Sequence, residues 1–409
     1  MSHTPKGWTL ARLGDIAQIK GGLAKGKDRE GAVLRSIPYL RVANVQQRYL
    51  DLSEVLEIGA TESEIRDLAL KTGDVLLNEG GDRDKLGRGW VWEGQIPLCI
   101  HQNHVFRARA KADLVDPYYL SYWANTEQAR NYFIKSGKQT TNLASISKSN
   151  LSNLPVPLPP LPEQRRIAAI LDQAEALRAK RRAALSKLKI LAQSIFIEMF
   201  GDLFAKSQPW PFGPVSRFVD GFESGKNLVA DDQEDQASQY RVLKISAVTS
   251  LEYRPSESKA LPAEYLPPKS HLVRMGDLLF SRANTADLIG ATVLVDSTPA
   301  NLVLPDKLWR VVWNPSNPTD PHWALALFRS AKFRQEIGKR ATGTSGSMKN
   351  ISQEKVLSIE IALPPIDLQR AFGEKFRSIE RLIKQHRGAL EKSDALFASL
   401  QHRAFRGEL

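Results

Sequence analysis

Two long stretches of the chain show the apolar spacing of helices. Residues 163–199 contain no Gly or Pro, and their apolar side chains recur in steps of four and three. This heptad spacing is typical of a helix that buries one narrow seam against another helix. A continuous helix over this stretch would be about 55 Å long at 1.5 Å per residue. The predicted seam positions are Ile170, Ala174, Leu177, Leu188 and Leu191.

The second stretch ends the chain and repeats this spacing, with polar breaks at His386 and Ser393. Two long helices with one seam each most simply bury those seams against each other. The alternative is that each helix packs on its own neighbouring domain. An antiparallel coiled-coil pair would relate the flanking domains by a pseudo-two-fold axis. The seam of this second helix is predicted at Phe376, Ile379, Ile383, Leu390 and Phe397.

The remaining sequence reads as strands and loops with occasional helices. Short alternating runs, such as residues 40–45, stand between clusters of Gly, Pro, Asn and Asp, which is the pattern of strands and turns. We therefore predict a mixed α/β (α+β) chain of four segments. These are a strand-rich domain at 1–157, a helix at 158–203, a second strand-rich domain at 204–362 and a helix at 363–409.

The chain is a tandem duplication. LKTGDVLL at residues 70–77 recurs as VRMGDLLF at 273–280, which is an offset of 203. LPPL at 158–161 returns as LPPI at 363–366, which is an offset of 205. Further matches occur in the same order at nearly constant spacing, so each copy is one strand-rich domain followed by one helix.

Charge and cysteine content restrict the class of protein. Lys and Arg outnumber Asp and Glu by 57 to 45, and the sequence pI is about 9.6. This balance favours nucleic acid as a partner, with an anionic membrane surface second. The single cysteine, Cys99, excludes an internal disulfide framework and a cysteine-based zinc cage. No apolar run approaches the roughly 18 residues of a membrane span, and the start has no signal-peptide pattern. We expect a soluble, cytoplasmic protein.

Several motifs together resemble the specificity (S) subunits of type I restriction–modification systems. LPPLPEQRRI at residues 158–167 resembles the signature that opens the conserved helix of that family. GWTL at 7–10 with LGD at 13–15 resembles the family's usual start, and GEL at 407–409 its usual end. The resemblance covers the whole chain in the order recognition domain, helix, recognition domain, helix. It departs at 367–369, where DLQ replaces PEQ at the start of the second helix.

The resemblance implies that each strand-rich domain is a target recognition domain that reads half of a split, asymmetric sequence in double-stranded DNA. The helices would set the unread spacer and dock two methyltransferase (modification) subunits, which use S-adenosylmethionine to methylate adenine at N6. The same core would recruit restriction endonuclease subunits that translocate DNA with ATP and Mg. These cofactors would belong to the partner subunits, so we expect no cofactor, metal site or catalytic residue in this chain, and no membrane partner.

The residues themselves agree with a non-catalytic role. Adenine methyltransferases use an Asn/Asp-Pro-Pro-aromatic loop, but the nearest match, DPYY at 116–119, lacks the second proline. Its repeat partner, DPHW at 320–323, indicates a shared helix start instead. Glycine-rich nucleotide-binding motifs are absent from the sequence. Two alternatives are a single-chain restriction–methylation enzyme, which lacks these motifs, and a coiled-coil scaffold with domains for other ligands, which the basic charge disfavours.

Three kinds of segment in each copy combine Gly with side chains suited to DNA. Arg and Lys read guanine, Asn and Gln read adenine, and Lys, Arg, Ser and Thr bind phosphates. The segments lie near each start, after each Gly-Asp strand and before each helix. For any one basic residue the alternative is a solvated surface charge. In the first copy the predicted contacts are Lys25, Lys27, Arg29, Arg41, Asn44, Asn78, Arg83, Arg88, Lys138, Gln139, Thr140 and Asn142. In the second copy they are Lys226, Asn227, Lys244, Arg282, Asn284, Thr285, Thr344, Ser345 and Lys349.

A basic cluster lies in the middle of the first helix, at Arg178, Lys180, Arg181 and Arg182. Outside the seam such residues are normally solvated, and the alternative is contact with spacer phosphates or an acidic partner. Arg181 falls on the predicted seam, where a polar residue can fix register at some cost in stability.

Overall fold

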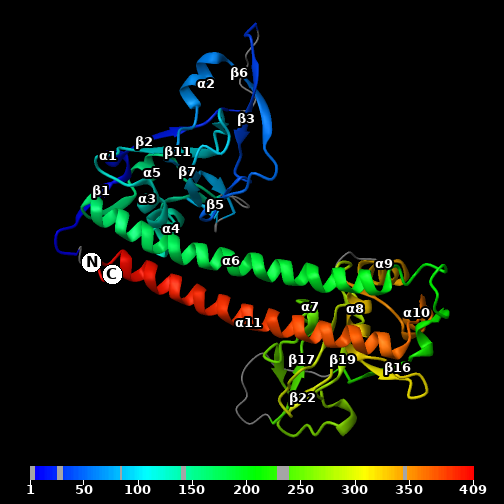
Figure 1. Ribbon diagram of the computed structural model, residues 1–409. Coiled ribbons are helices and arrows are strands. Elements are labelled where there is room, and N and C mark those ends of the chain that lie inside the picture. Colours follow the sequence, from blue (N-terminus) through cyan, green and yellow to red (C-terminus); the bar gives the residue numbers. More distant parts are fainter. Residues whose placement is uncertain (1–4, 25–30, 83–84, 140–143, 228–238, 344–347) are drawn as a thin grey trace. The chain divides into compact units, whose positions relative to one another are not determined.

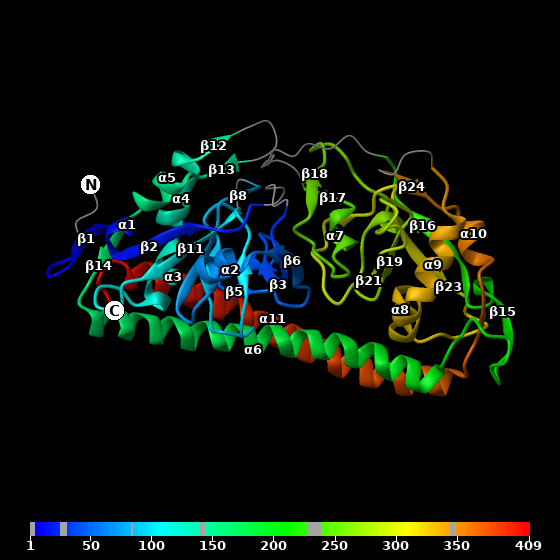
Figure 2. The ribbon, with the colours of Figure 1, turned by 90° about the horizontal axis from the view of Figure 1, so that it is seen from above.

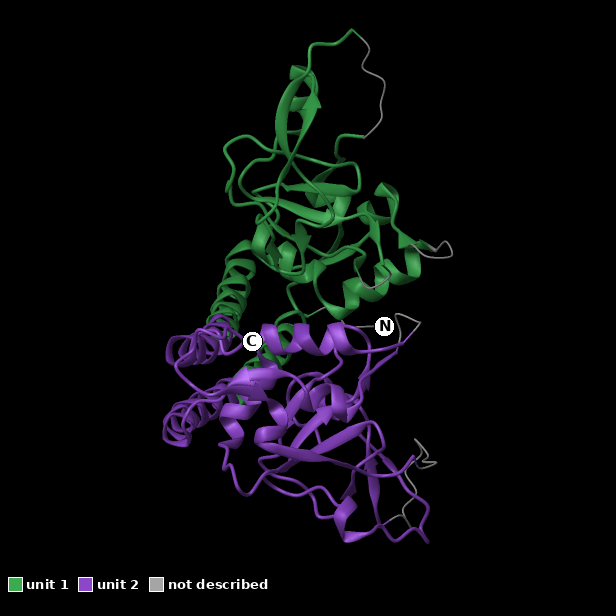
Figure 3. Ribbon diagram, turned by 90° about the vertical axis from the view of Figure 1, so that its right-hand side faces the viewer, with its two compact units in different colours: residues 1–182, 388–409 green, residues 183–387 purple. Residues whose placement is uncertain are grey.

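The chain folds into two compact units, unit 1 (residues 1–182 and 388–409) and unit 2 (183–387) (Figure 3). Both boundaries fall inside the two long helices, α6 (Leu161–Phe200) and α11 (Ile366–Ala404). Each unit therefore contains one strand-rich region and a segment of each long helix (Figure 1). The predicted mixture of helices and strands is confirmed. The computed structural model describes residues 5–24, 31–82, 85–139, 144–227, 239–343 and 348–409.

Unit 1 is built on a four-stranded antiparallel sheet with the order β2-β11-β7-β9. Its central strand β7 is buried at every position, as expected for the nearly continuous apolar run DVLLN. The one charged member, Asp74, accepts hydrogen bonds from Arg109 of β11 at 2.7 and 2.8 Å. The strands are β2 (Ala17–Gly21), β11 (Val105–Ala110), β7 (Asp74–Asn78) and β9 (Gly89–Val91).

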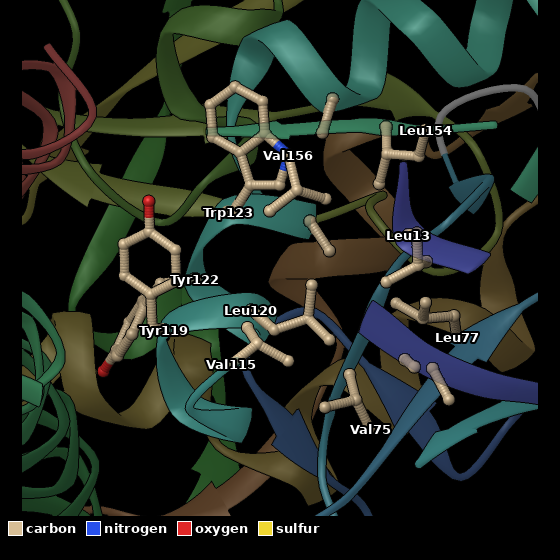
Figure 4. Packing of buried hydrophobic residues seen from close by; sticks show 14 of the residues in the cluster. Leu13, Val75, Leu77, Val115, Tyr119, Leu120, Tyr122, Trp123, Leu154 and Val156 are labelled. Carbon is tan, nitrogen blue, oxygen red and sulfur yellow. The ribbon is translucent and has the colours of Figure 1, made fainter. Parts of the chain in front are cut away.

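Helix α3 (Pro117–Ala124) covers this sheet. Its start is fixed by Asp116, whose carboxylate accepts from the backbone N–H of Tyr118 and Tyr119, with Pro117 in the first turn. In unit 2, Asp320 and Pro321 begin α8 (Pro321–Arg329) in the same way. The helix-start interpretation of the two Asp-Pro motifs is thus confirmed. Figure 4 shows α3 side chains clustered with those of β7 in the core of unit 1.

A smaller three-stranded sheet extends unit 1. Its central strand β3 (Arg35–Leu40) runs parallel to β10 (Ile100–His101) and antiparallel to β6 (Leu56–Ala60). Helix α2 (Glu62–Leu68) follows, capped by reciprocal hydrogen bonds between Thr61 and Glu64. The remaining elements of the unit are α1 (Leu13–Ile16), α4 (Glu127–Ser136), α5 (Lys148–Ser152) and the short strands β1 (Thr9–Arg12), β4 (Val45–Gln46), β5 (Tyr49–Leu50), β8 (Gly80–Gly81), β12 (Lys138–Gln139), β13 (Ala144–Ser145) and β14 (Pro155–Leu158).

Unit 2 repeats this topology. Its four-stranded sheet has the order β16-β23-β19-β21, and the central β17 of the smaller sheet is parallel to β22 and antiparallel to β18. The only two non-glycine residues with positive φ among the described residues, Arg48 and Leu251, are also 203 positions apart.

The strands of unit 2 are β15 (Phe212–Pro214), β16 (Val219–Ser224), β17 (Arg241–Leu243), β18 (Ser258–Ala260), β19 (Leu278–Ser281), β20 (Ala283–Asn284), β21 (Thr292–Leu294), β22 (Leu302–Val303), β23 (Leu308–Trp313), β24 (Lys349–Asn350) and β25 (Glu360–Ala362). The other helices are α7 (Ser246–Thr249), α9 (Ala331–Arg340), α10 (Gln353–Leu357) and the 3-10 turns η2 (Val215–Arg217) and η3 (Lys269–His271).

The two long helices run unbroken (Figure 2) and antiparallel. In unit 1, Arg166 near the start of α6 bonds the carbonyl of Leu409, while Arg178 further along bonds Asp394. On α11 the buried positions include Phe376, Ile379, Ile383 and Phe397, and Leu390 is half-buried. In unit 2 the aromatic rings of Phe196 and Phe372 pack edge to face at 5.4 Å.

The seam predicted on α6 needs correction at two positions. Ile170, Ala174 and Leu188 are half-buried, but Leu177 and Leu191 are 42% and 45% exposed. Arg178, one residue after Leu177, is buried instead, and Leu171 and Phe196 are buried as well. The physical reason is that α6 packs against the strand-rich core of unit 1 near its start and of unit 2 near its end, as well as against α11, so its buried face is wider than a two-helix seam.

Candidate DNA-binding surfaces

In each unit, backbone pairing brings together two of the segments predicted to contact DNA. In unit 1, Gly80 of β8 pairs with Ser145 of β13, which in turn pairs with Lys138 of β12. Lys138 is exposed. In unit 2, Asn284 of β20 pairs with Lys349 of β24. The loop after the Gly-Asp strand and the loop before the long helix thus form one surface in each copy.

The backbone frame behind these surfaces is the same in both units. The N–H of Glu79 donates to the carbonyl of His104 at 2.9 Å, and the equivalent N–H of Arg282 donates to Lys307 at 3.1 Å. Ile146 and Ile351 then donate to the carbonyls of Glu79 and Arg282. The side chains carried by this frame differ between the units. Unit 1 has Glu79 and His104 where unit 2 has Arg282 and Lys307.

In unit 1 several described polar and charged side chains of the predicted DNA-binding segments have partners within the protein. His104 Nδ1 lies 2.8 Å from a carboxylate oxygen of Glu79. The guanidinium of Arg41 lies 3.2 Å from the carboxylate of Glu54. Arg88 donates to the side chain of Gln46 at 2.7 Å. Arg41 and Arg88 therefore have partners in the protein and would have to exchange them to contact DNA.

In unit 2 the equivalent region forms a basic hollow, which we call the lysine hollow. It has a volume of about 420 Å³ and is lined by Lys226, Lys244, Lys259, Lys307 and Asp306, with Asn227 beside them. The structure thus brings the neighbouring Lys226 and Asn227 together with Lys244, which follows β17. Lys259 and Lys307 were missed, although the repeat offers a signal, because Lys307 aligns with His104 at the constant offset of 203.

The other predicted residues of unit 2 lie beside this hollow or beyond it. Arg282 donates through Nε to the backbone carbonyl of Asp306 at 2.8 Å. Its Nη2 lies 3.8 Å from the side-chain carboxylate of the same residue. Thr285 is exposed at the surface, and Lys349 donates through Nζ to the carbonyl of Gly343. Asn284 uses its side-chain oxygen to accept from the N–H of Thr285.

Two predicted contacts are structural residues. Asn44 is buried, and its amide donates to the carbonyls of Asp51 and Glu54 while its oxygen accepts from the N–H of Arg41. Asn78 is also buried and donates to the carbonyl of Val45 at 2.9 Å. Both amides satisfy backbone groups that would otherwise be buried without partners, so neither is available to a base.

Eight of the residues predicted to contact DNA lie outside the described residues. For a ninth, Gln139, only the backbone is described. The backbone of Gln139 belongs to β12. Those outside the described residues are Lys25, Lys27, Arg29, Arg83, Thr140, Asn142, Thr344 and Ser345.

The basic cluster of α6 contains both exposed and buried residues. Lys180 and Arg182 are exposed, whereas Arg178 is buried and bonds Asp394 at 2.6 Å and the neighbouring Glu175. The Arg178 guanidinium lies 4.5 Å from the ring centre of Phe397, and that of Arg48 lies 4.6 Å from the same centre. Arg178 is therefore a packing residue of unit 1 and not a phosphate contact.

Part of the chain matches a family model, and curated proteins resemble nearly all of it. Residues 5–187 match the family model described as the type I restriction modification DNA specificity domain. The chain is 23% identical to the type I restriction enzyme EcoKI specificity subunit of Escherichia coli, over 99% of this chain and 90% of that protein. It is also 23% identical to the MjaVIII specificity subunit of Methanocaldococcus jannaschii, over 95% of this chain and 90% of that protein.

Solved structures show the same fold. The S subunit of a type I restriction–modification system from M. genitalium superposes with a TM-score of 0.58 at 12% identity, covering 97% of this chain and 96% of that one. A chain from a type I R-M system solved to explain complex assembly superposes with a TM-score of 0.54 at 18% identity over the whole of both chains. Among the described residues, no helix combines the length and the apolar character needed to cross a membrane.

Proposed function

We propose that this chain, as a member of the specificity subunits of type I restriction–modification systems, selects the DNA sequence on which partner enzymes act. Each unit reads one half of a split, asymmetric target in double-stranded DNA. The observation that carries this proposal is the duplicated backbone frame with different charged side chains at equivalent places, such as Glu79 and Arg282. A two-part, asymmetric target requires two recognition domains that share one fold but carry different surface side chains.

We propose no catalytic role for the chain itself. S-adenosylmethionine, ATP and Mg would act on the methyltransferase and on the restriction endonuclease subunits, which carry out adenine-N6 methylation and restriction. The setting would be the cytoplasm, where DNA and these partners meet.

Exchange of residues 1–157 for the corresponding domain of a relative should change only one half of the methylated sequence, because each unit reads its own half. Single-molecule sequencing of methylated adenines in cells carrying the partner subunits measures this directly. Exchange of 204–362 is the matched experiment and should change only the other half. The chain purified alone should transfer no labelled methyl group. A change in both halves after one exchange would contradict the modular interpretation.

The exposed apolar residues of the long helices support docking of two copies of one partner. Leu177 aligns with Leu382, and Leu191 with Leu396, at the repeat offset of 205. All four are between 42% and 51% exposed. Leu177 and Leu396 belong to unit 1, whereas Leu191 and Leu382 belong to unit 2. Each unit thus presents one equivalent pair of exposed leucines, and two equivalent surfaces fit two methyltransferase subunits.

Replacing Leu177 and Leu396 together by glutamate should remove one of two methyltransferase copies, because a buried charge opposes an apolar contact. Leu191→Glu with Leu382→Glu should remove the other copy. The mass of the purified complex, measured by native mass spectrometry, reports the number of copies. Gln193→Glu with Gln385→Glu is the control, because both residues are exposed positions of the same helices. Retention of both copies by both leucine variants would refute the docking proposal.

A further inference from the structure

One backbone position in each unit presents a charged side chain from a rigid support. Glu79 directly follows β7, and Arg282 directly follows β19, at the repeat offset of 203. Both residues are hydrogen-bonded through their backbone N–H and their backbone carbonyl, each to the equivalent neighbours in its unit. Their side chains are similarly accessible, with 26% of Glu79 and 31% of Arg282 exposed. The two units therefore present one side chain each from the same fixed place in the fold.

The partner of this side chain changes with it. In unit 1, Nδ1 of His104 lies 2.8 Å from a carboxylate oxygen of Glu79, so a ring nitrogen on the neighbouring turn faces the acid. In unit 2 the same turn carries Asp306, which aligns with Asn103. The backbone carbonyl of Asp306 accepts from Nε of Arg282 at 2.8 Å, and its carboxylate lies 3.8 Å from Nη2. Because the pairing of strand end and turn is kept with opposite polarity, the fold does not dictate which charge the strand end presents.

The change of polarity alters what the strand end can bind. A carboxylate only accepts hydrogen bonds, whereas a guanidinium only donates them. In the major groove of DNA, cytosine presents the N4 amino donor and guanine presents the two acceptors N7 and O6. Adenine presents its N7 acceptor beside its N6 donor. A side chain that only accepts therefore suits cytosine, because the N7 of adenine repels it, and a fork of donors suits guanine.

We propose that the position shared by Glu79 and Arg282 determines one base pair of each half-site. Glu79 accepts from N4 of a cytosine in the half-site of unit 1, and Arg282 donates to N7 and O6 of a guanine in the half-site of unit 2. The inference rests on the proposed function and assigns to it one base contact in each unit. Among the described residues, no hydrogen bond reaches the second carboxylate oxygen of Glu79 or the terminal nitrogens of Arg282. These atoms are therefore available to a base.

The test reads the methylated sequence produced by the full chain with its partner subunits, by single-molecule sequencing. Glutamine reads adenine through one donor and one acceptor. Glu79→Gln should therefore change one C·G pair of the half-site of unit 1 to A·T, and methylation of the original sequence should fall about tenfold or more. Arg282→Gln should make the same kind of change at one G·C pair of the other half-site. In each variant the half-site of the unaltered unit should stay the same, which reports that the chain is still folded.

Glu163→Gln is the matched control, because Glu163 is a carboxylate of unit 1 with 30% of its side chain exposed and with Arg166 as its partner. This control should leave both half-sites unchanged. A variant that methylates too little DNA to be sequenced is measured by binding of its complex to duplexes with C·G or A·T at that pair.

The outcomes separate the inference from the proposed function. If the unmodified chain directs methylation to no fixed two-part sequence, the proposed function fails. If that sequence exists but one half-site contains no G·C pair, the base assignment is wrong. The assignment is also overturned if either glutamine variant keeps the original base preference. Weaker methylation or binding of every sequence, with the preference unchanged, would mean that the side chain contacts phosphate or stabilises the protein and reads no base.

Discussion

Replacing Arg178 by alanine is expected to destabilise unit 1 by about 3 kcal/mol, because it breaks a buried ion-pair network. Arg178 is only 8% exposed, donates to Asp394 and Glu175, and lies against the ring of Phe397. Its loss removes the main partner of Asp394 and opens the space beside Phe397. Arg48 and Arg182 still lie near Glu175, which keeps the expected cost at the lower end of the range for buried pairs.

The control is Arg182→Ala on the same helix. Arg182 contacts the same two carboxylates but is 46% exposed. Solvent screening limits such a pair to about 1 kcal/mol or less. Urea unfolding of the full chain, followed by tryptophan fluorescence, gives the free energy of the first transition for both variants. Equal costs for the two arginines would show that burial of Arg178 contributes nothing.

Stability of unit 1 should fall as the pH drops from about 6.5 to about 4, because burial lowers the pKa of His101 to about 4. Its Nδ1–H donates to the carbonyl of Val105 at 2.7 Å, and its Nε2 has no partner among the described residues. A second proton on this ring would be buried without an acceptor. Between these pH values the unfolded chain binds a proton that the folded chain does not, so acid favours unfolding by on the order of 3 kcal/mol.

His101→Leu should remove this part of the pH dependence. The repeat itself supplies the replacement, because Leu304 occupies the equivalent place in unit 2 and is fully buried there. The measurement is the free energy of unfolding of both proteins at about pH 7 and pH 4.5. The difference between the two pH values should be smaller in the variant. If both proteins lose the same stability in acid, carboxylates and not His101 control the transition.

Repetition and strong periodicity made most of the architecture predictable from sequence. In α11 charged residues separate most of the heptad positions, and the predicted seam residues are buried or half-buried. In α6, alanine and leucine occur on several faces, and a simple heptad count placed Leu177 and Leu191 on the seam although both are exposed. The pattern could not distinguish a face that packs within the chain from a face left for solvent or a partner.

The individual DNA contacts were harder to predict, for a chemical reason. The amide that can read adenine is also the group that satisfies buried backbone carbonyls, and Asn44 and Asn78 are used for the second purpose. Lys259 and Lys307 were missed, although the offset of 203 already aligns Lys307 with His104 in the sequence. Their convergence depends on loop geometry, which no period in the sequence encodes.

The discontinuity of unit 1 affects the order in which the chain folds during synthesis. Phe405, near the end of α11, belongs to the core of unit 1 and packs its ring 5.3 Å from that of Tyr119 and 5.2 Å from that of Trp123. All of residues 183–387 leave the ribosome before this segment does. Unit 2 can therefore complete its core on a contiguous stretch of nascent chain, whereas unit 1, whose strands emerge first, closes last. Until then Tyr119 and Trp123 lack the ring of Phe405 as a neighbour. The core of unit 1, whose strands are synthesised before those of unit 2, therefore stays incomplete and open to aggregation while translation continues.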